Sequence, residues 1–260
     1  MSTWRPSKNC TYVISDIHGM YDELQLIFSR ILPLRKTGKS FDKIIFLGDY
    51  IDRSVKSHMV IDILMELKAN QPDQVIFLKG NHEQIFLDAI SPTQTQSQYN
   101  MWMGNGGIHT LLGYLQRANS DIENPLSIPR KNIDVYIPKG HIDFIKNTIP
   151  YYEDNDFIFV HGGCDPFVPL KEQEENVLIW DRSVYNQILR ITNFKQSKCP
   201  WEKTIVTGHS GNTEGQILVY DKFMMLDMSP AQRVCVLELN SMQCFSARHN
   251  KARLVKEPIT

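Results

Sequence analysis

The sequence predicts an α/β fold with a mainly parallel sheet, a helical insertion and a second, mixed or antiparallel sheet packed on the first. Residues 11 to about 90 alternate between short apolar runs and segments whose apolar residues recur at helical spacing, which is typical of βαβ units. The pattern changes near Ser91, and β-rich pieces dominate from about residue 156. The chain has 260 residues, so we expect a single domain over 1–260 with a mainly helical insertion at about 91–155.

The first part of the chain contains three expected strands, each followed by an expected helix. Apolar residues recur at helical spacing between Leu24 and Ile31 and between Met59 and Leu67, and a third helix begins after Gly80. Crossover helices between consecutive strands produce parallel pairing. The expected strands are Tyr12–Ile14, Ile44–Leu47 and Val75–Leu78.

The insertion begins with polar residues and contains a helical stretch near 140–147. It could form a cap that shapes access to a site, or it could be a structural elaboration. Beyond it, short runs rich in β-branched and aromatic residues predict the second sheet, and the Tyr220–Phe223 step predicts a hairpin turn. Residues 247–260 are polar, and we expect them to be loosely held. The expected strands are Phe157–Val160, Thr204–Thr207, Ile217–Tyr220, Phe223–Leu226 and Arg233–Leu239.

The composition is that of an ordinary globular protein, with 42% hydrophobic and 22% charged residues. The formal net charge of −1 gives no sign of a broad basic surface, so we expect neither nucleic acid nor a membrane as a partner. The first residues lack the apolar core of a signal peptide, and the five cysteines show no C-x-x-C spacing, which predicts a cytoplasmic protein with reduced thiols. Cys164 could be a soft metal ligand or a small residue in a tight loop.

Six short motifs place carboxylates, histidines, an asparagine and arginines where metal ions and a phosphate would need them. The first three directly follow the three expected strands of the first part, and polar residues at the ends of successive buried strands form active sites in open α/β folds. The motifs are Ser15–Gly19, Gly48–Arg53, Gly80–Glu83, His161–Gly163, Trp180–Arg182 and Gly208–His209.

These motifs predict a site for two metal ions. Asp16 and His18 point the same way from an extended segment and can bind one ion together, while Asp49 could bridge to a second ion. Mixed nitrogen and oxygen ligation suits Mn²⁺, Fe or Zn²⁺, with Mn²⁺ expected in vitro. Two such ions about 3.5–4 Å apart activate a bridging water for attack at phosphorus. The second ion would be completed by Asn81, His161 and His209.

The motifs also predict a proton donor and a phosphate clamp. His82 could protonate the leaving oxygen, and Asp52 could hydrogen-bond its far ring nitrogen, which fixes the ring and favours imidazolium. Arg53 and Arg182 would offer planar donor forks to the phosphate oxygens.

Each residue taken alone also has an ordinary structural explanation that involves no metal or phosphate. Asn81 could be a helix N-cap, His161 could be a satisfied buried histidine, and an Asp-x-His pair is usually a capping or surface pair. All of these structural explanations would have to be correct at the same time for the motifs to form no metal site. For the histidines that lie in none of the six motifs, we prefer the structural explanation. These are His58, His109, His141 and His249.

Together the motifs resemble those of the phosphoprotein phosphatase family of metallophosphoesterases, which includes serine/threonine phosphatases and their bacterial and phage relatives. The family pattern is G-D-x-H-G, G-D-x-x-D-R-G, G-N-H-E, H-G/A-G, an arginine after tryptophan, and G-H, and the match runs from Asp16 to His209. Trp102, with Asn105–Gly107 and Ile149–Tyr152, is similar to the smaller bacterial members. The departures from the pattern are Ser15, Ser54 and Ser210, and none of them is a ligand. Ser54 could change the conformation of the loop that holds Arg53.

The resemblance implies a metallophosphoesterase-type β-sandwich of two mixed sheets flanked by helices, with the insertion as a mainly helical cap. It also implies two divalent metal ions as cofactors and a phosphorylated protein or small phosphoester as the substrate. The residues that resemble the family's metal ligands are Asp16, His18, Asp49, Asn81, His161 and His209; its proton-donating pair corresponds to His82 and Asp52, and its phosphate clamps to Arg53 and Arg182.

We therefore expect a phosphomonoesterase that hydrolyses phosphoserine or phosphothreonine, or phosphotyrosine, by direct attack of a metal-bridging water. The alternative is a dinucleoside-polyphosphate hydrolase of the same superfamily, whose motifs typically read G-D-x-x-A/G-R-G and G-N-H-D where this chain has Asp52 and Glu83. A nuclease is disfavoured because the overall charge indicates no basic groove. A rival of another class is an inactive scaffold that binds partners through the cap.

Overall fold

The first of two β-sheets is six-stranded and mixed, and its strands lie in the order β11-β10-β9-β1-β2-β3. In this computed structural model the described residues are 10–32, 41–165, 168–183, 202–248 and 254–259. Strand β1 pairs in parallel with β2 on one side and antiparallel with β9 on the other. The strands are β1 (Thr11–Ile14), β2 (Lys43–Phe46), β3 (Val75–Phe77), β9 (Arg233–Glu238), β10 (Gln243–Arg248) and β11 (Val255–Glu257).

The second sheet is five-stranded and also mixed, in the order β4-β5-β6-β8-β7. Its central strands β5, β6 and β8 are parallel, and β4 and β7 are antiparallel edges. Its strands are β4 (Tyr151–Glu153), β5 (Phe157–Val160), β6 (Thr204–Thr207), β7 (Leu218–Tyr220) and β8 (Phe223–Met225).

The two sheets form a sandwich because the residues on their facing sides are apolar. On β1, Val13 packs with Phe159 and Val206 of the second sheet, while Tyr12 and Ile14 belong to a separate cluster under the helices. Successive side chains of a strand point to opposite faces, so a strand covered on both sides must be apolar throughout. This explains why the inner strands read as unbroken apolar runs in the sequence.

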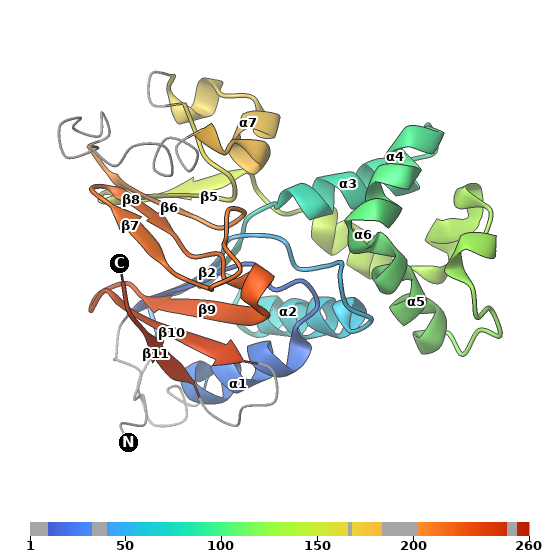
Figure 1. The fold of residues 1–260 in the computed structure, drawn as a ribbon, viewed down its shortest axis with the longest axis horizontal. Helices are drawn as coiled ribbons and strands as arrows, with labels where there is room; N and C mark the ends of the chain where they lie inside the picture. The colour runs from blue at the N-terminus through green and yellow to red at the C-terminus, as the bar shows by residue number, and fades with distance from the viewer. Residues whose placement is uncertain (1–9, 33–40, 166–167, 184–201, 249–253, 260) are drawn as a thin grey trace.

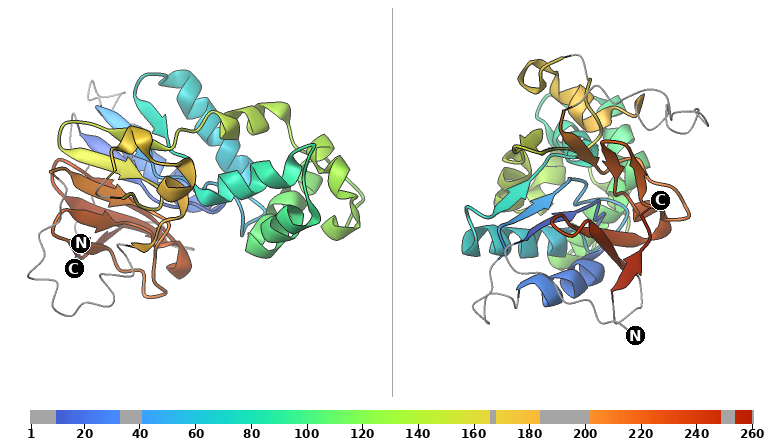
Figure 2. Two further views of the ribbon diagram at one scale, coloured as in Figure 1. Left: turned by 90° about the horizontal axis from the view of Figure 1, so that it is seen from above. Right: turned by 90° about the vertical axis from the view of Figure 1, so that its left-hand side faces the viewer.

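Helices cover the outer faces of both sheets (Figures 1 and 2). Helices α1 and α2 pack on the first sheet, and α7 lies over the second. The segment 91–155 contributes α4 to α6 at one end of the sandwich, with a π-helical turn, Met103–Gly107, between α4 and α5. The helices are α1 (Tyr21–Ile31), α2 (Ser57–Asn70), α3 (Asn81–Ile90), α4 (Gln96–Trp102), α5 (Ile108–Arg117), α6 (Lys139–Lys146) and α7 (Glu175–Trp180). Short 3-10 turns are η3 (Pro125–Ser127), η4 (Arg130–Tyr136), η5 (Leu170–Glu172) and η7 (Ser229–Ala231).

The predicted β-sandwich of two mixed sheets with flanking helices is confirmed. The strand expected at Arg233–Leu239 in the second sheet is instead β9 of the first sheet, where it pairs with β1 and β10. Three strands in the described ranges were not predicted from the sequence. These are β4, β10 and β11. The polar segment 247–260 was expected to be loosely held, and that expectation is wrong for Ala247 and Arg248, which end β10, and for Val255–Glu257, which form β11. Residues 249–253 and 260 lie outside the described residues. The short strand is held by pairing with β10 rather than by an apolar run of its own, and such pairing leaves no local signal. No helix in the described ranges has the length and apolar character needed to cross a membrane.

Candidate metal centre

The candidate ligands lie together because they follow the carboxyl ends of neighbouring strands. Asp16 and His18 follow β1, Asp49 follows β2, His161 follows β5 and His209 follows β6. Asn81 is the first residue of α3, directly beyond β3. Every one of these side chains is buried, with an exposed fraction of 5% or less. The sandwich therefore concentrates polar groups in an interior where they need partners.

Asp49 occupies the centre of this cluster, and its two oxygens face different partners. Its Oδ2 lies 3.4 Å from His18 Nε2, and its Oδ1 lies 3.3 Å from His161 Nε2. Among the described residues, two groups of histidine and carboxylate atoms are compact enough to hold an ion, and Asp49 belongs to both. One oxygen for each of two ions is the arrangement of a bridging carboxylate. The two groups are His18, Asp49 and His82, and Asp49, His161 and His209.

The histidine rings are oriented by their far nitrogens. His18 Nδ1 donates to the Ile51 carbonyl at 2.9 Å, and His161 Nδ1 donates to the Leu47 carbonyl at 2.7 Å. A ring that donates to a carbonyl through Nδ1 leaves the Nε2 lone pair for a metal, which is the usual support of a histidine ligand.

The surroundings of the His209 and Asn81 side chains are also those expected of metal ligands. The Nε2 atom of His209 is buried and has no hydrogen-bond partner among the described residues. The Oδ1 atom of Asn81 lies 3.1 Å from His161 Nε2, so this side chain points into the cluster; the N-cap of α3 is Gly80 instead. A buried nitrogen without a partner beside oxygen donors is what a nitrogen- and oxygen-ligated ion would satisfy.

Asp16 is placed differently from the other candidates. Both of its oxygens accept from the His209 backbone N–H, at 3.1 and 3.0 Å, and Asp16 belongs to neither compact group. Burial and the nearby charge of Asp227 raise the pKa of Asp16 well above its ordinary value. A cation would offset the repulsion between these carboxylates.

The pKa shifts within the cluster reflect close packing of opposite charges. Burial alone would raise the pKa of Asp49, but His161 and His82 hold it well below its usual range. Burial would lower the pKa of His161, but Asp49 dominates and raises it to about 9. His209 is lowered to a pKa of about 3 by burial and then by the charge of His161. Strong mutual perturbation of buried groups is typical of functional sites.

Backbone strain is concentrated in the same loops. Residues other than glycine rarely adopt positive φ, because the side chain then crowds the backbone. Such strain persists where surrounding contacts enforce it, commonly at active sites. The site residues with positive φ are His18 (43°), Asp49 (53°), Asp52 (73°), Arg53 (65°) and His209 (60°).

Glu83 fixes the turn that carries Asp49, a role that sequence reasoning missed. Its carboxylate accepts from the backbone N–H groups of Asp49 and Tyr50, both at 2.8 Å, and of Gly80 at 3.0 Å. A Cβ on Gly80 would lie 2.1 Å from Asp49 Oδ1, so only glycine allows this approach. Burial and then the charge of Asp49 raise the pKa of Glu83 to about 7. The signal was present as the last residue of the Gly80–Glu83 motif.

His82 and Asp52 form the pair expected from the sequence. His82 Nδ1 lies 2.7 Å from Asp52 Oδ2, and both side chains are buried. Burial would lower the pKa of His82, but Asp49 and Asp52 raise it above its ordinary value. The ring of His82 also lies near that of His18, with centroids 4.6 Å apart. His82 is thus geometrically able to be a metal ligand or a proton donor.

The two arginines are exposed, and each contacts a different part of the cluster. Arg53 Nη2 lies 3.2 Å from His82 Nε2, and Arg182 Nη1 lies 3.5 Å from Ser210 Oγ, next to His209. The buried ligands and exposed guanidinium groups together can hold an anion above the metal positions. Ser54, the departure that could affect Arg53, accepts a hydrogen bond from Lys56 N at 3.2 Å.

The insertion supplies a second set of contacts that the sequence did not reveal. Trp102 Nε1 and Thr110 Oγ1 both donate to Asp52 Oδ1, at 3.0 and 2.9 Å. Gly106, with φ of 102°, accepts from Arg53 N at 3.1 Å. Segments about fifty residues apart therefore meet at Asp52 and Arg53. These contacts explain why Trp102 and the Asn105–Gly107 segment occur together in the insertion.

Asp227 is a further buried carboxylate close to Asp16 that sequence reasoning missed. It follows β8 by two residues, as Asp16 follows β1 and His209 follows β6, and this offset was the available signal. Burial raises its pKa above the ordinary value despite a hydrogen bond from Ser229 N at 2.8 Å.

Cys164 and the other histidines of the described ranges belong to neither metal group. Cys164 packs in an apolar cluster with Val160 and Leu178 and belongs to neither metal group, which favours the tight-loop alternative. His141 bonds to Tyr114 and to Asp62. His58 Nδ1 bonds to the Val55 carbonyl, His109 is exposed, and His249 lies outside the described residues.

Comparisons with known proteins agree with this geometry. The family described as calcineurin-like phosphoesterase matches residues 11–228. A Schizosaccharomyces pombe protein named "Putative serine/threonine-protein phosphatase C22H10.04" is 28% identical over 170 residues, which cover 65% of this chain and 43% of that protein. The chain spans less than half the length of the curated relatives it matches.

Solved structures show a similar fold at low sequence identity. One, titled "Crystal structure of a putative diadenosine tetraphosphatase", has a TM-score of 0.55 and 14% identity, and the alignment covers 98% of this chain and 97% of that chain. The cold-active protein-tyrosine phosphatase of a psychrophilic Shewanella has a TM-score of 0.53 and 16% identity, with 99% and 83% covered.

Proposed function

Since the chain belongs to the calcineurin-like phosphoesterase family, we propose that it is a metal-dependent phosphomonoesterase that hydrolyses phosphoserine or phosphothreonine, with phosphotyrosine as a further substrate. The observation that carries the proposal is the Asp49 carboxylate, whose oxygens face His18 and His161 separately, beside the His82–Asp52 pair. The cytoplasmic location and the single domain over 1–260 remain predictions from the sequence.

The residues of the site would bind one metal ion, bind a second metal ion and bind the phosphate. Two divalent ions, of which Mn²⁺ is the first to test, would supply a nucleophilic water and neutralise phosphate charge when bound. Asp16, His18 and Asp49 would hold one ion. Arg53 and Arg182 would bind phosphate oxygens. The second ion would be held by Asp49, Asn81, His161 and His209.

The His82–Asp52 pair favours an ester of an alcohol as the substrate. A serine alkoxide is a poor leaving group and needs a proton as its bond to phosphorus breaks. Asp52 fixes the His82 ring through Nδ1, and the nearby carboxylates raise the pKa of His82, so its Nε2 can carry that proton. A phosphate leaving group of a dinucleoside polyphosphate needs less help from an acid.

A side-by-side activity panel tests the proposal. We expect phosphoserine and phosphothreonine peptides to be hydrolysed with Mn²⁺ present, and hydrolysis to be lost in excess chelator and restored by Mn²⁺. Faster cleavage of a dinucleoside tetraphosphate would favour the alternative function. Full activity after prolonged chelation would exclude the metal-dependent mechanism, and no activity on any phosphoester would favour the scaffold.

Removing the donors that hold Asp52 should slow the reaction without displacing metal. Trp102→Phe keeps a large ring against Phe86 but removes the N–H, and Thr110→Val removes the hydroxyl; each leaves Asp52 Oδ1 with one donor fewer in a buried place. Because an under-satisfied buried carboxylate orients His82 poorly, we expect kcat on a phosphoserine peptide to fall about tenfold in each variant, with KM little changed.

A comparison of two substrates distinguishes an effect on His82 from a purely structural effect of the same variants. The loss should be smaller on p-nitrophenyl phosphate, whose leaving group needs little protonation, and metal content should not change. Met101→Ala, on the exposed side of the same helix, is the matched control. Equal losses on both substrates, together with a lowered melting temperature, would reduce Trp102 and Thr110 to structural residues.

A further inference from the structure

The two proposed ions differ in where their ligands come from. The ligands of the first ion all follow strands of the first sheet, β1 and β2. The ligands of the second ion come from both sheets, because Asp49 and Asn81 follow β2 and β3, whereas His161 and His209 follow β5 and β6. The geometry of the second ion therefore depends on how the two sheets are placed relative to each other.

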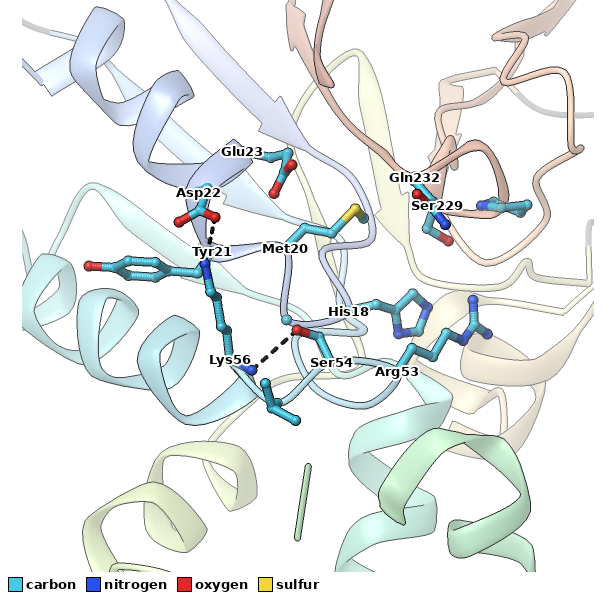
Figure 3. Close-up of a pocket in the computed structure, with 13 residues that line it drawn as sticks. His18, Met20, Tyr21, Asp22, Glu23, Arg53, Ser54, Lys56, Ser229 and Gln232 are labelled. Carbon is cyan, nitrogen blue, oxygen red and sulfur yellow. Dashed lines mark hydrogen bonds and ion pairs between the residues drawn. The ribbon is translucent and has the colours of Figure 1, made fainter. Parts of the chain in front are cut away.

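The first ion's position lies beside a pocket of about 510 Å³, which is formed by the loops after β1 and β2 and by the η7 turn. Figure 3 shows His18 and Arg53 together at one end of this pocket. As far as the described residues form its wall, neither α7 nor the turn after β3 takes part. A substitution on α7 or in that turn therefore leaves this pocket unchanged.

Helix α7 spans the two sheets beside the second ion's ligands. Leu178 packs in the apolar cluster of the second sheet, and Trp180 packs against the cluster between the first sheet and its helices. The Trp180 ring also lies edge-on to the ring of His209, with centroids 6.1 Å apart. Gly162, directly after His161, donates its N–H to the Leu178 carbonyl at 2.8 Å. This helix therefore supports both histidines that the second sheet supplies.

An ion pair fixes the start of α7 to the turn that carries Asn81. Lys79 Nζ lies 2.5 Å from Glu175 Oε1, and Glu175 is the first residue of α7. Lys79 lies two residues before Asn81, and its backbone N–H donates to the Ile149 carbonyl at 2.8 Å. The Lys79 side chain is only 12% exposed, so solvent and salt screen this pair less than a fully exposed one. The pair joins a helix of the second sheet to a strand end of the first.

We propose that the Lys79–Glu175 ion pair braces the two sheets at the second metal position, so that breaking it weakens binding of the second ion and spares the first. The inference rests on the proposed metal-dependent function and goes beyond it, because it gives the two ions different supports. Lys79 and Glu175 are positioning residues that act through the Asn81 turn and through α7.

A direct electrostatic effect of these side chains on the ions would give a different result. Lys79→Met removes a positive charge and would tighten cation binding if charge alone mattered, whereas Glu175→Gln removes a negative charge and would weaken it. Loss of a brace weakens the second ion in both variants. The sign of the effect of Lys79→Met therefore separates the two explanations.

The test is a calorimetric titration of the metal-free protein with Mn²⁺, which reports the affinity of each ion without any substrate. Asn81→Ala removes a proposed ligand and identifies the step that belongs to the second ion. We expect Lys79→Met and Glu175→Gln each to weaken that step by about three- to fivefold and to leave the other step within about twofold. The exchange variant, with Lys79→Glu and Glu175→Lys together, re-forms the pair in reverse and should recover most of the affinity.

The Lys203–Glu153 ion pair provides the matched control, with 2.8 Å between Nζ and Oε2. It lies within the second sheet, at the ends of the strands that are opposite to the metal centre, because Lys203 precedes β6 and Glu153 pairs with the start of β5. Lys203→Met and Glu153→Gln should leave both binding steps unchanged.

The outcomes separate this inference from the proposed function. Unchanged affinities in both single variants, a tighter second step in Lys79→Met, equal weakening of both steps, or no recovery in the exchange variant would overturn the brace while the metal-dependent phosphatase stands. Binding of fewer than two Mn²⁺ ions by the wild-type protein would refute the two-metal function, and the brace with it.

Discussion

Replacing Asp49 with asparagine is expected to lower kcat by about 10³-fold or more, because the nucleophile and the charge neutralisation both depend on the metal pair. The structure gives the reason for so large an effect. Each oxygen of Asp49 faces a different histidine, at 3.3 and 3.4 Å, and an amide nitrogen in place of one oxygen cannot bind a cation. The fold should survive, since asparagine has nearly the same shape and the turn is held by Glu83.

Metal binding itself provides a readout that does not depend on activity. Wild-type protein should gain thermal stability when Mn²⁺ is added, because a ligand that binds only the folded state stabilises it. Asp49→Asn should lose most of that gain and retain clearly less metal after dialysis. Asp73→Asn, at an exposed position, is the matched control. A variant that keeps both its ions and its rate would show that Asp49 does not bridge.

Replacing His82 with asparagine is expected to separate substrates by their leaving groups. General acid catalysis contributes about 10²–10⁴-fold, so a loss of that size is expected on phosphoserine peptides. The loss should be distinctly smaller on p-nitrophenyl phosphate, since a nitrophenolate leaves without much protonation. Asp52→Asn should show the same bias in milder form, because it removes the acceptor that orients the ring at 2.7 Å.

Metal content decides between the two roles that the geometry allows His82. Its ring nitrogens lie close enough to His18 and Asp49 to form a metal group. If His82 is the proton donor, His82→Asn should bind as much Mn²⁺ as the wild-type protein. Loss of an ion, with equal rate losses on both substrates, would instead make His82 a ligand.

The sequence allowed the fold class and much of the site to be predicted because the required information is local. Apolar runs such as Ile44–Leu47 identify strands that are covered on both faces, and polar motifs placed directly after them identify the strand ends. Once β1, β2 and β3 are parallel, their carboxyl ends lie at one edge of the first sheet, so Asp16 and Asp49 lie near each other without any further signal. His161 follows β5 of the second sheet, and it meets Asp49 because the two sheets pack on each other. Strands β10 and β11 were missed because they depend on pairing with a neighbour.

The site's supporting contacts could not be predicted in the same way. That Trp102 and Thr110 bond to Asp52, or that Asp227 lies near Asp16, depends on how the insertion and the second sheet pack, and neither contact produces a periodic pattern. The sequence by itself determined which chemical groups were available and which strand ends would carry them. The tertiary structure alone decided which atoms face each other, for instance that the two oxygens of Asp49 meet separate histidines, because that outcome depends on long-range packing and on backbone strain enforced from several sides.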